Sequence, residues 1–286
     1  MKIIITGDKG LIGTFLSERL KKEGHEIILT IDLKDGKDIH YLKKIGTEFL
    51  NKADMVIHAA AFCKINKCIE NPIFAHENST DAFEVLEFCR INKIPKIVFF
   101  SSSRILCDEK NPYTASKIYG EELCKAYRQC YNIDYIIIRP STVYGPILDK
   151  TKRLMHIFIS NAILGKDLEI FGDPKTKTLD FTYVDDFIDG VMLVINNNQW
   201  NQEFNISGNQ EFNIFELAQF IIGEIKSISK IKVYDPEIAQ PQSVRLDLSS
   251  IEKLGYCPKV TIKEGVIRNI EKYKELYIKD KNIFDF

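Results

Sequence analysis

Short runs of aliphatic residues alternate along the chain with longer segments in which apolar residues recur at helical spacing. The runs that predict strands lie at 3–5, 27–31, 55–58, 97–100 and 135–138. Continuous apolar runs are typical of strands buried on both faces, so the pattern predicts an α/β fold with a parallel sheet. A helix is predicted between the first two runs, ending at Gly24, whereas 32–37 predicts a turn into a short strand near 38–41.

Further helices begin at prolines or follow later strands. Pro72 and Pro112 stand at predicted helix starts, a position that proline favours, and we expect these helices to reach Cys89 and Tyr131. After Pro140, glycines and prolines interrupt the pattern, which predicts a second lobe of loops and short elements. Regular elements return as predicted helices at 184–195, 214–225 and 262–278 and a predicted strand at 203–206.

A glycine-rich loop joins the first strand to the first helix. It carries Gly7, Gly10 and Gly13 in a G-x-x-G-x-x-G spacing. Glycines at such a turn let the backbone approach a pyrophosphate, which the N-terminus of the helix can hold. The same spacing could form a turn without a ligand, but the position of the loop within a βαβ unit favours a dinucleotide site.

Asp32 ends the second predicted strand, 19 residues after Gly13. A carboxylate at this place accepts hydrogen bonds from the adenosine ribose and repels a 2′-phosphate, which favours NAD over NADP. Lys34 and Lys37 weaken that preference, because either side chain can reach a phosphate. We therefore predict NAD as the cofactor. No metal is expected, since the chain has no C-x-x-C pair with a neighbouring histidine cluster.

A tyrosine and a lysine follow the serines that end the strand at 97–100. Tyr113 and Lys117 are four residues apart, so they lie on one face of the next predicted helix. A lysine ammonium beside a phenol favours the phenolate, and the tyrosine can then act as a base near neutral pH. The motif alone arises by chance in a lysine-rich chain. Its order after the glycine loop, Asp32 and Ser103 indicates oxidoreductase chemistry.

In these motifs the chain resembles the extended short-chain dehydrogenase/reductase family, in its NAD-dependent epimerase/dehydratase branch, which acts on nucleotide sugars. The resemblance extends over nearly the whole chain, through the further segments Asp54-Met55-Val56-Ile57-His58-Ala59-Ala60-Ala61, Asn71-Pro72, Glu77-Asn78-Ser79-Thr80, Arg139-Pro140-Ser141-Thr142-Val143-Tyr144-Gly145-Pro146, Phe171-Gly172-Asp173, Asp180-Phe181-Thr182-Tyr183-Val184-Asp185-Asp186, Phe204-Asn205-Ile206 and Lys253-Leu254-Gly255-Tyr256-Cys257-Pro258. It implies a doubly wound parallel (Rossmann) sheet that binds NAD, formed by 1–140 and about 183–226. A small C-terminal substrate-binding lobe would comprise 141–182 and about 227–286.

The resemblance also implies roles for individual residues. Ser103 would hydrogen-bond the reacting hydroxyl or carbonyl, Tyr113 would exchange its proton, and Lys117 would hold the nicotinamide ribose and lower the pKa of the tyrosine. The implied cofactor-binding residues are Gly7, Gly10, Leu11, Ile12, Gly13, Asp32, Ala59, Ala60, Asn78, Tyr113, Lys117 and Arg139. The implied substrate-binding residues are Ser103, Thr142 and Arg245.

Departures from the family pattern narrow the expected reaction. Arg104 and Ile105 stand where the family's dehydratases carry an Asp-Glu pair, so we expect no 4,6-dehydration. The segment between Ser103 and Tyr113 is short, which predicts a more open pocket. We expect hydride transfer at a secondary alcohol, most simply C4, of a nucleoside-diphosphate sugar, by a 4-epimerase or by a 4-keto reductase or dehydrogenase.

Two alternatives remain open from the sequence. Thr142 and Leu179 replace the asparagine and arginine with which the family contacts phosphate, and this favours an oxidoreductase acting on a non-nucleotide substrate. A non-catalytic NAD-sensing protein on the same fold is the other alternative, although Ser103, Tyr113 and Lys117 are all present.

Composition and charge exclude other classes of protein. With 39 basic and 40 acidic residues the formal charge is −1, so no basic field exists to hold nucleic acid or an anionic membrane. No apolar stretch approaches the roughly 20 residues of a membrane span. Seven cysteines without a disulfide-type pattern indicate reduced thiols and a cytoplasmic location. The resemblance implies a homodimer through the helices near 72–89 and 112–131, whose apolar faces could equally belong to the core.

Overall fold

The computed structural model describes residues 1–149 and 151–285, and the chain divides into two compact units. The first unit comprises Met1–Pro140, Ile188–Ile206 and Asp247–Tyr256. The second unit comprises Ser141–Phe187, Ser207–Leu246 and Cys257–Phe286. No helix in the described part of the chain is both long enough and apolar enough to cross a membrane.

The boundaries of these units differ from the expected domains at 183–187, 207–226 and 247–256. The segment 207–226 was expected in the cofactor domain, but its Leu217 and Ile221 lie in the core of the second unit. The segment 247–256 was expected in the lobe, but it belongs to the first unit, where Asn205 Nδ2 donates to the Asp247 carbonyl at 2.9 Å. Burial against neighbours that are distant in sequence decides both assignments.

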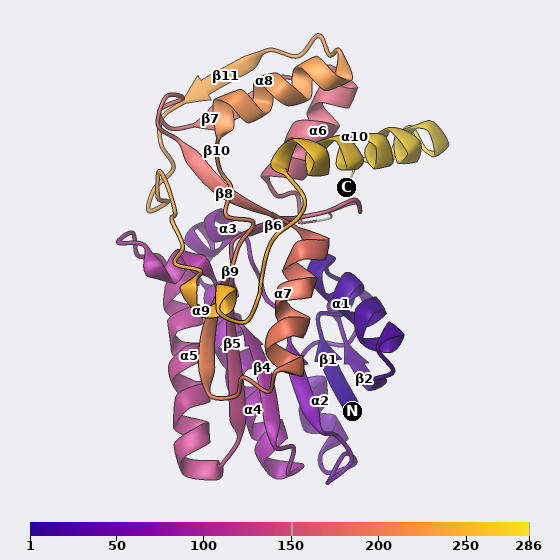
Figure 1. Cartoon of the computed structure of the whole chain (residues 1–286), viewed down its shortest axis with the longest axis vertical. Coiled ribbons are helices and arrows are strands. Elements are labelled where there is room, and N and C mark those ends of the chain that lie inside the picture. The colour runs from indigo at the N-terminus through magenta and orange to yellow at the C-terminus, as the bar shows by residue number, and fades with distance from the viewer. Residues whose placement is uncertain (150, 286) are drawn as a thin grey trace. The chain divides into compact units, whose positions relative to one another are not determined.

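The first unit is built on a six-stranded sheet of parallel strands, ordered β2-β1-β3-β4-β5-β9 (Figure 1). Its strands are β1 Lys2–Thr6, β2 Glu26–Ile31, β3 Met55–His58, β4 Lys96–Phe100, β5 Asp134–Pro140 and β9 Gln202–Ile206. The chain leaves β1 for β2 and then returns to β3 on the other side of β1. A ligand crevice is expected at such a reversal, at the carboxyl ends of the strands.

Helices cover the sheet, and its strands β1, β3 and β4 are buried on both faces, as the continuous apolar runs predict, whereas β2 is mostly half-buried. The helices of this unit are α1 Leu11–Lys22, α2 Tyr41–Ile45, α3 Ile65–Glu70, α4 Ile73–Ile91, α5 Pro112–Tyr131, most of α7 Val184–Asn196, and α9 Ser249–Glu252, with 3-10 turns η1 Leu33–Asp35 and η2 Ser103–Leu106. Ile4, Val56 and Ile97 pack in one core cluster with residues of α4 and α5, and the alternate residues Ile3 and Ile5 are also fully buried.

Gly120 on α5 lets the helix approach β4 closely. A Cβ at this position would lie 2.3 Å from the Phe99 ring, well inside contact distance. The parallel sheet and these helices confirm the predicted α/β fold class.

The strand expected near 38–41 is wrong. Asp32 caps η1, accepting a hydrogen bond from Lys34 N, and α2 follows. Ile39, Leu42 and Ile45, spaced by three residues, turn their side chains into the core, where α2 packs on α4. Helical burial of these three residues explains why no strand forms there.

The second unit has a three-stranded sheet ordered β10-β8-β6 and a two-stranded sheet of β11 and β7 (Figure 1). Its strands are β6 Thr142–Tyr144, β7 Leu168–Phe171, β8 Thr178–Tyr183, β10 Glu211–Asn213 and β11 Ile231–Tyr234, and its helices are α6 Leu154–Leu164, α8 Ile214–Ile225 and α10 Ile262–Lys279. The unit is more regular than expected, because α6 was not predicted. Apolar residues lie on most sides of α6, so its sequence lacks the polar stripe that marks an amphipathic helix.

Candidate active site

The glycine loop packs tightly against the loop that follows β3. Gly7 has φ +78°, and a Cβ there would lie 2.6 Å from Ala60 N and 2.8 Å from the Ala59 carbonyl carbon. A Cβ on Gly13 would lie 2.0 Å from the Gly7 carbonyl oxygen. The structure thus brings together Gly7, Gly13, Ala59 and Ala60, which the sequence assigned to cofactor binding.

The first turn of α1 suits an anion. Gly10 is the residue before the helix, no side chain caps it, and the first turn, which begins with Leu11 and Ile12, contains no acidic residue. Unshielded amides at a helix N-terminus bind phosphate groups. The glycine positions leave no room for a Cβ, and the start of α1 has no side-chain cap. Both features fit the pyrophosphate of a dinucleotide.

Asp32 is held in place by the glycine loop. Its carboxylate accepts from Lys9 N at 3.0 Å and from Lys34 N at 2.9 Å. A carboxylate can accept about four hydrogen bonds, which leaves capacity for ribose hydroxyls. Lys34 Nζ donates to the Lys9 carbonyl at 2.5 Å, and Lys37 Nζ lies 5.3 Å from the centre of the Tyr41 ring. Both lysines are thus engaged within the chain, which fits NAD better than NADP.

Asn78, on α4, holds the loop after β3 through its side-chain amide. Its side-chain oxygen accepts from Phe62 N at 2.8 Å, and its side-chain nitrogen donates to the Phe62 carbonyl at 3.0 Å. The residue is 5% exposed. The resemblance assigns Asn78 to the cofactor, and in the structure both ends of its amide bind the backbone of Phe62.

Tyr113 and Lys117 lie together on the first two turns of α5. Asn111 and Thr114 cap the helix reciprocally, and Pro112 occupies the first turn. Lys117 Nζ donates to the Phe100 carbonyl at the end of β4, at 3.0 Å, and lies 6.0 Å from the centre of the Tyr113 ring. Both side chains are buried, and the contact of Lys117 with Phe100 places the lysine at the carboxyl end of β4.

Burial controls the charge of both groups. It raises the pKa of Tyr113 well above the ordinary value for a tyrosine, and a hydrogen bond from the Ser102 hydroxyl opposes this shift. Burial lowers the pKa of Lys117 to about 8, while Cys63 and Asp81 act in the opposite direction. A Tyr113 phenolate near neutral pH therefore requires further positive charge, which a bound nicotinamide ring would supply.

Ser102 is a site residue that the sequence reasoning missed. The resemblance assigned Ser103, and the structure places both serines in the buried segment after β4. Ser102 Oγ caps η2 by accepting from Arg104 N at 3.2 Å, and its hydroxyl is hydrogen-bonded to Tyr113. The Ser-Ser-Ser run was visible in the sequence, but only the backbone turn at η2 decides which hydroxyl reaches the tyrosine.

Four further titratable side chains surround Lys117 and were not assigned. They are His58 on β3, Asp81 on α4, and Cys63 and Cys68 in and before α3. Burial lowers the pKa of His58 to about 3, and its Nδ1 lies 2.7 Å from Thr6 Oγ1, so the ring is neutral. Burial raises the pKa of Asp81 to about 7.

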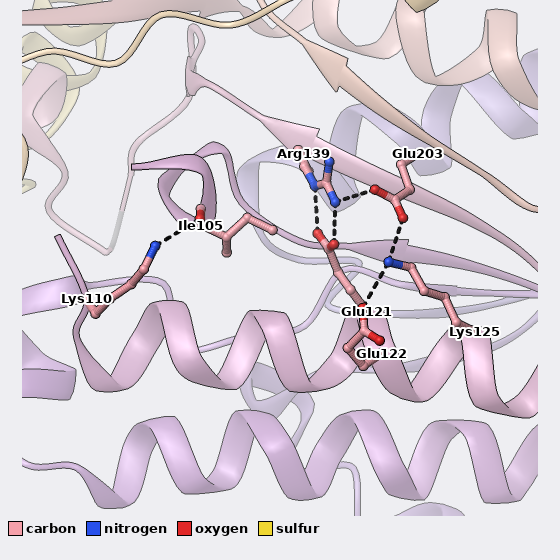
Figure 2. A network of polar contacts seen from close by, with 7 residues as sticks. All are labelled: Ile105, Lys110, Glu121, Glu122, Lys125, Arg139 and Glu203. Atoms are coloured by element: carbon pink, nitrogen blue, oxygen red, sulfur yellow. Dashed lines mark hydrogen bonds and ion pairs between the residues drawn. The ribbon is translucent and has the colours of Figure 1, made fainter. Parts of the chain in front are cut away.

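Arg139, which the resemblance assigns to the cofactor, forms ion pairs with acidic residues of α5 and β9. Figure 2 shows its guanidinium bound to two carboxylates. Nε and Nη2 donate to the two oxygens of Glu121 at 2.8 and 2.5 Å, and Nη2 also contacts Glu203. The N–H groups of Arg139 therefore bind two carboxylates within the chain, a structural contact that the sequence motif does not indicate.

The short segment between Ser103 and Tyr113 is braced by its own residues. Lys110 Nζ donates to the Cys107 carbonyl at 2.5 Å and to the Ile105 carbonyl at 3.4 Å (Figure 2). Arg104 lies in η2, close enough to Tyr113 for its positive charge to lower the pKa of the phenol.

The substrate-binding residues expected in the second unit lie on two different segments. Thr142 begins β6 and pairs with Phe181 on β8, whereas Arg245 is exposed in the segment after β11. Leu179, which replaces the arginine with which the family contacts phosphate, has its side chain buried in the core of this unit. Lys177 is also buried, and its Nζ donates to the Pro241 carbonyl at 2.9 Å.

Comparison with known proteins agrees with this geometry. A relative from Methanocaldococcus jannaschii named "Putative UDP-glucose 4-epimerase" is 30% identical over 300 residues, covering 93% of this chain and 96% of its own. The crystal structure of UDP-glucuronic acid 4-epimerase from Bacillus cereus, in complex with UDP-glucuronic acid and NAD, superimposes with a TM-score of 0.87 at 25% identity, over 97% of this chain and 100% of that one.

The UDP-glucose 4-epimerase of Thermotoga maritima has the same fold, with a TM-score of 0.87 at 21% identity over 96% of this chain and 99% of that one. Residues 3–207 match the model of a family that is defined by its use of NAD, which agrees with the predicted cofactor. The loop, the buried tyrosine–lysine pair and this match together show that the chain is an enzyme of the NAD dependent epimerase/dehydratase family.

Proposed function

We propose that this enzyme transfers a hydride between NAD and a secondary alcohol or ketone, at C4, of a nucleoside-diphosphate sugar. It would act as a 4-epimerase or as a 4-keto reductase or dehydrogenase. The observation that carries the proposal is the buried Tyr113–Lys117 pair, with Lys117 fixed to the end of β4. The names of the relatives with UDP-glucose and UDP-glucuronic acid support a nucleotide sugar as the substrate.

Each side chain has a defined task in this proposal. Tyr113 takes the proton from the C4 hydroxyl as the C4 hydrogen leaves with its electron pair, and it returns that proton when the ketone is reduced. NAD, when bound, supplies the acceptor for that electron pair. Lys117 donates to the nicotinamide ribose, and Ser103 or Ser102 donates to the reacting oxygen. The hydrogen bond from Ser102 to Tyr113 makes this serine a second candidate for that task.

Elimination of water does not form part of the proposed reaction. A 4,6-dehydratase needs an acid and a base beside the sugar, and Arg104 and Ile105 occupy the expected positions. Arginine stays protonated and isoleucine has no transferable proton. A dehydratase from Streptomyces venezuelae shares the fold with a TM-score of 0.87 at 21% identity, so the fold itself carries no information on this point.

A homodimer and a cytoplasmic location complete the proposal. The large apolar side chains exposed on α4 and α5 are Ile73, Phe83, Ile91, Ile118, Tyr119 and Tyr131. A second copy of the chain would cover such residues, whereas Val85, Leu86 and Cys124 of the same helices already belong to the core. All seven cysteines are free thiols, which fits a reducing compartment.

A panel of nucleotide sugars tests the proposed function. The NAD-loaded enzyme is incubated with UDP-, dTDP-, GDP- and CDP-hexoses and with UDP-glucuronate, and the products are resolved by proton NMR. We expect inversion at C4, or a 4-keto product with NADH. A product that has lost one water would contradict the proposal. If no nucleoside diphosphate binds, the substrate is a non-nucleotide alcohol instead.

A further inference from the structure

One face of α5 carries four charged or titratable side chains at intervals of four residues. They are Tyr113, Lys117, Glu121 and Lys125. Residues spaced in this way lie one above the other along a helix. Tyr113, Lys117 and Glu121 are each at most 6% exposed, so the row enters the protein interior at its catalytic end.

Two successive side chains of this row form hydrogen bonds with neighbouring strands. Lys117 Nζ donates to the Phe100 carbonyl on β4, and the Glu121 carboxylate accepts two hydrogen bonds from Arg139 on β5 (Figure 2). Phe100 pairs with Ile138, the residue before Arg139, so the two ties reach adjacent strands at the same level. A paired, two-point attachment of one helical turn restricts both its rotation and its translation.

The second tie continues into a chain of alternating charges. Arg139 also contacts Glu203 on β9, and Lys125 Nζ bridges Glu203 at 2.8 Å and Glu122 at 2.9 Å. Counting from Lys117, three positive groups (Lys117, Arg139, Lys125) face three negative groups (Glu121, Glu203, Glu122), so the set is neutral. Hydrogen bonds hold the Glu121 charge in place, because both of its oxygens are bound by one rigid guanidinium.

We propose that Glu121 is a positioning residue for the hydride-transfer site: with Arg139 it fixes the turn of α5 that carries Lys117, and its fixed negative charge supports the ammonium of Lys117. This inference rests on the proposed role of Lys117 in binding the nicotinamide ribose. Burial of the Lys117 side chain lowers the pKa of this lysine to about 8, and Glu121 is among the groups that oppose the shift. Without Glu121 the lysine would lose its charge at a lower pH.

Other groups near Lys117 must be considered, because they titrate or carry charge. They are Tyr113 on α5, His58 on β3, Asp81 on α4, and Cys63 and Cys68 in and before α3. Asp81 has a pKa of about 7 and can contribute to any pH profile measured near neutrality. Each measurement is therefore repeated in an Asp81→Asn background.

The test compares Glu121→Gln with Glu122→Gln. Glu122 is the adjacent residue, and its side chain is 67% exposed. It contacts Lys125 at the end of the network, so Glu122→Gln removes the same charge and leaves the contacts of Lys117 with Phe100 and of Glu121 with Arg139 in place. NAD affinity is measured by calorimetry from about pH 6 to 10, in the absence of substrate, together with the hydride-transfer rate. In the wild type, affinity should fall as Lys117 loses its proton.

We expect the midpoint of this fall to move to lower pH in Glu121→Gln and to stay in place in Glu122→Gln. The hydride-transfer rate should fall about 10-fold or more in Glu121→Gln. A midpoint unchanged in Glu121→Gln overturns the inference. If the shift is present but no nucleotide sugar reacts with the wild type, the proposed function fails and the positioning role stands.

A double variant, Glu121→Gln with Arg139→Gln, separates positioning from stability. Glu121→Gln alone should lower the thermal stability, because it leaves the Arg139 charge without its main carboxylate. The double variant removes both charges of the pair, so it should regain this stability. The positioning role requires that the pH midpoint stay shifted in this stable protein. A return of midpoint and rate to wild-type values, together with the melting temperature, would show that Glu121 serves stability alone.

Discussion

Gly7 and Gly24 provide a matched pair of substitutions that measures how closely the glycine loop approaches its neighbour. Both residues have a left-handed backbone, with φ of +78° and +82°. A Cβ on Gly24 would meet no atom within 4 Å, whereas one on Gly7 would lie 2.6 Å from Ala60 N and 2.8 Å from the Ala59 carbonyl carbon. The two alanine variants therefore share the conformational cost and differ in the collision.

The magnitude follows from these two terms. A left-handed alanine costs about 1–2 kcal/mol, and this cost applies to both variants. Pushing backbone atoms apart in a packed site adds about 1–3 kcal/mol for Gly7→Ala only. The expected free energy of unfolding is thus lower by about 1–2 kcal/mol in Gly24→Ala and by about 2–5 kcal/mol in Gly7→Ala. The reduced entropy of the unfolded chain affects both alike and cancels in the comparison.

Urea denaturation and NAD calorimetry of both variants provide the assay. NAD affinity should be unchanged in Gly24→Ala. It should be at least about 10-fold weaker in Gly7→Ala, because a displaced glycine loop that loses about 1.4 kcal/mol of binding free energy binds ten times more weakly. Equal stability and equal NAD affinity in the two variants would refute the close approach of the glycine loop to Ala59 and Ala60.

Four shorter predictions address other parts of the molecule. Tyr113→Phe should keep its NAD affinity and lose about 10²–10⁴-fold in turnover, measured by steady-state kinetics; wild-type turnover would remove Tyr113 from the mechanism. Asp32→Ala should lose its preference for NAD over NADP in parallel titrations with both cofactors; an unaltered ratio would show that the carboxylate does not select. A hydrogen bond that His40 donates to the Glu84 carboxylate raises the pKa of His40, so the stabilisation from this pair is complete below the ordinary histidine pKa and is lost as the pH rises through the raised value. The gap in urea midpoint between wild type and His40→Gln should accordingly close as the pH rises above about 6.5 and through the raised pKa, and a gap that widens with pH contradicts the pairing. Iodoacetamide should label the exposed Cys130 and Cys257 first and Cys89 and Cys124 last, as read by mass spectrometry, because burial raises the pKa of the last two thiols; early labelling of Cys89 would contradict its burial.

The sequence predicted the elements whose apolar pattern matches their final burial. The five predicted strands β1 to β5 all form, and the apolar runs of β1, β3 and β4 are buried on both faces, so the pattern and the structure agree. The segment 38–41 was mispredicted because Ile39, Leu42 and Ile45 follow a three-residue spacing that only the contact with α4 makes visible. The helix α6 was missed because its burial on several sides removes the polar stripe.

The site residues also divide into those placed by local helix geometry and those placed by contacts with other parts of the fold. Tyr113 and Lys117 are neighbours because a helix places residues four apart on one face, which the sequence alone determines. Arg139, Asn78 and Ser102 depend on partners far away in the chain: Glu121 and Glu203, the backbone of Phe62, and the phenol of Tyr113. No local pattern indicates such partners, so these contacts could not be predicted from the motifs.

The self-braced segment between Ser103 and Tyr113 has a consequence for how this enzyme can diversify. Ser102 caps η2 on one side, and Asn111 with Thr114 caps α5 on the other, so each end of the segment is stabilised independently of its middle. Lengthening a surface loop costs little entropy when its ends are already fixed. Residues 106–109 are therefore a place where a longer loop can be inserted while the serines and the tyrosine keep their places.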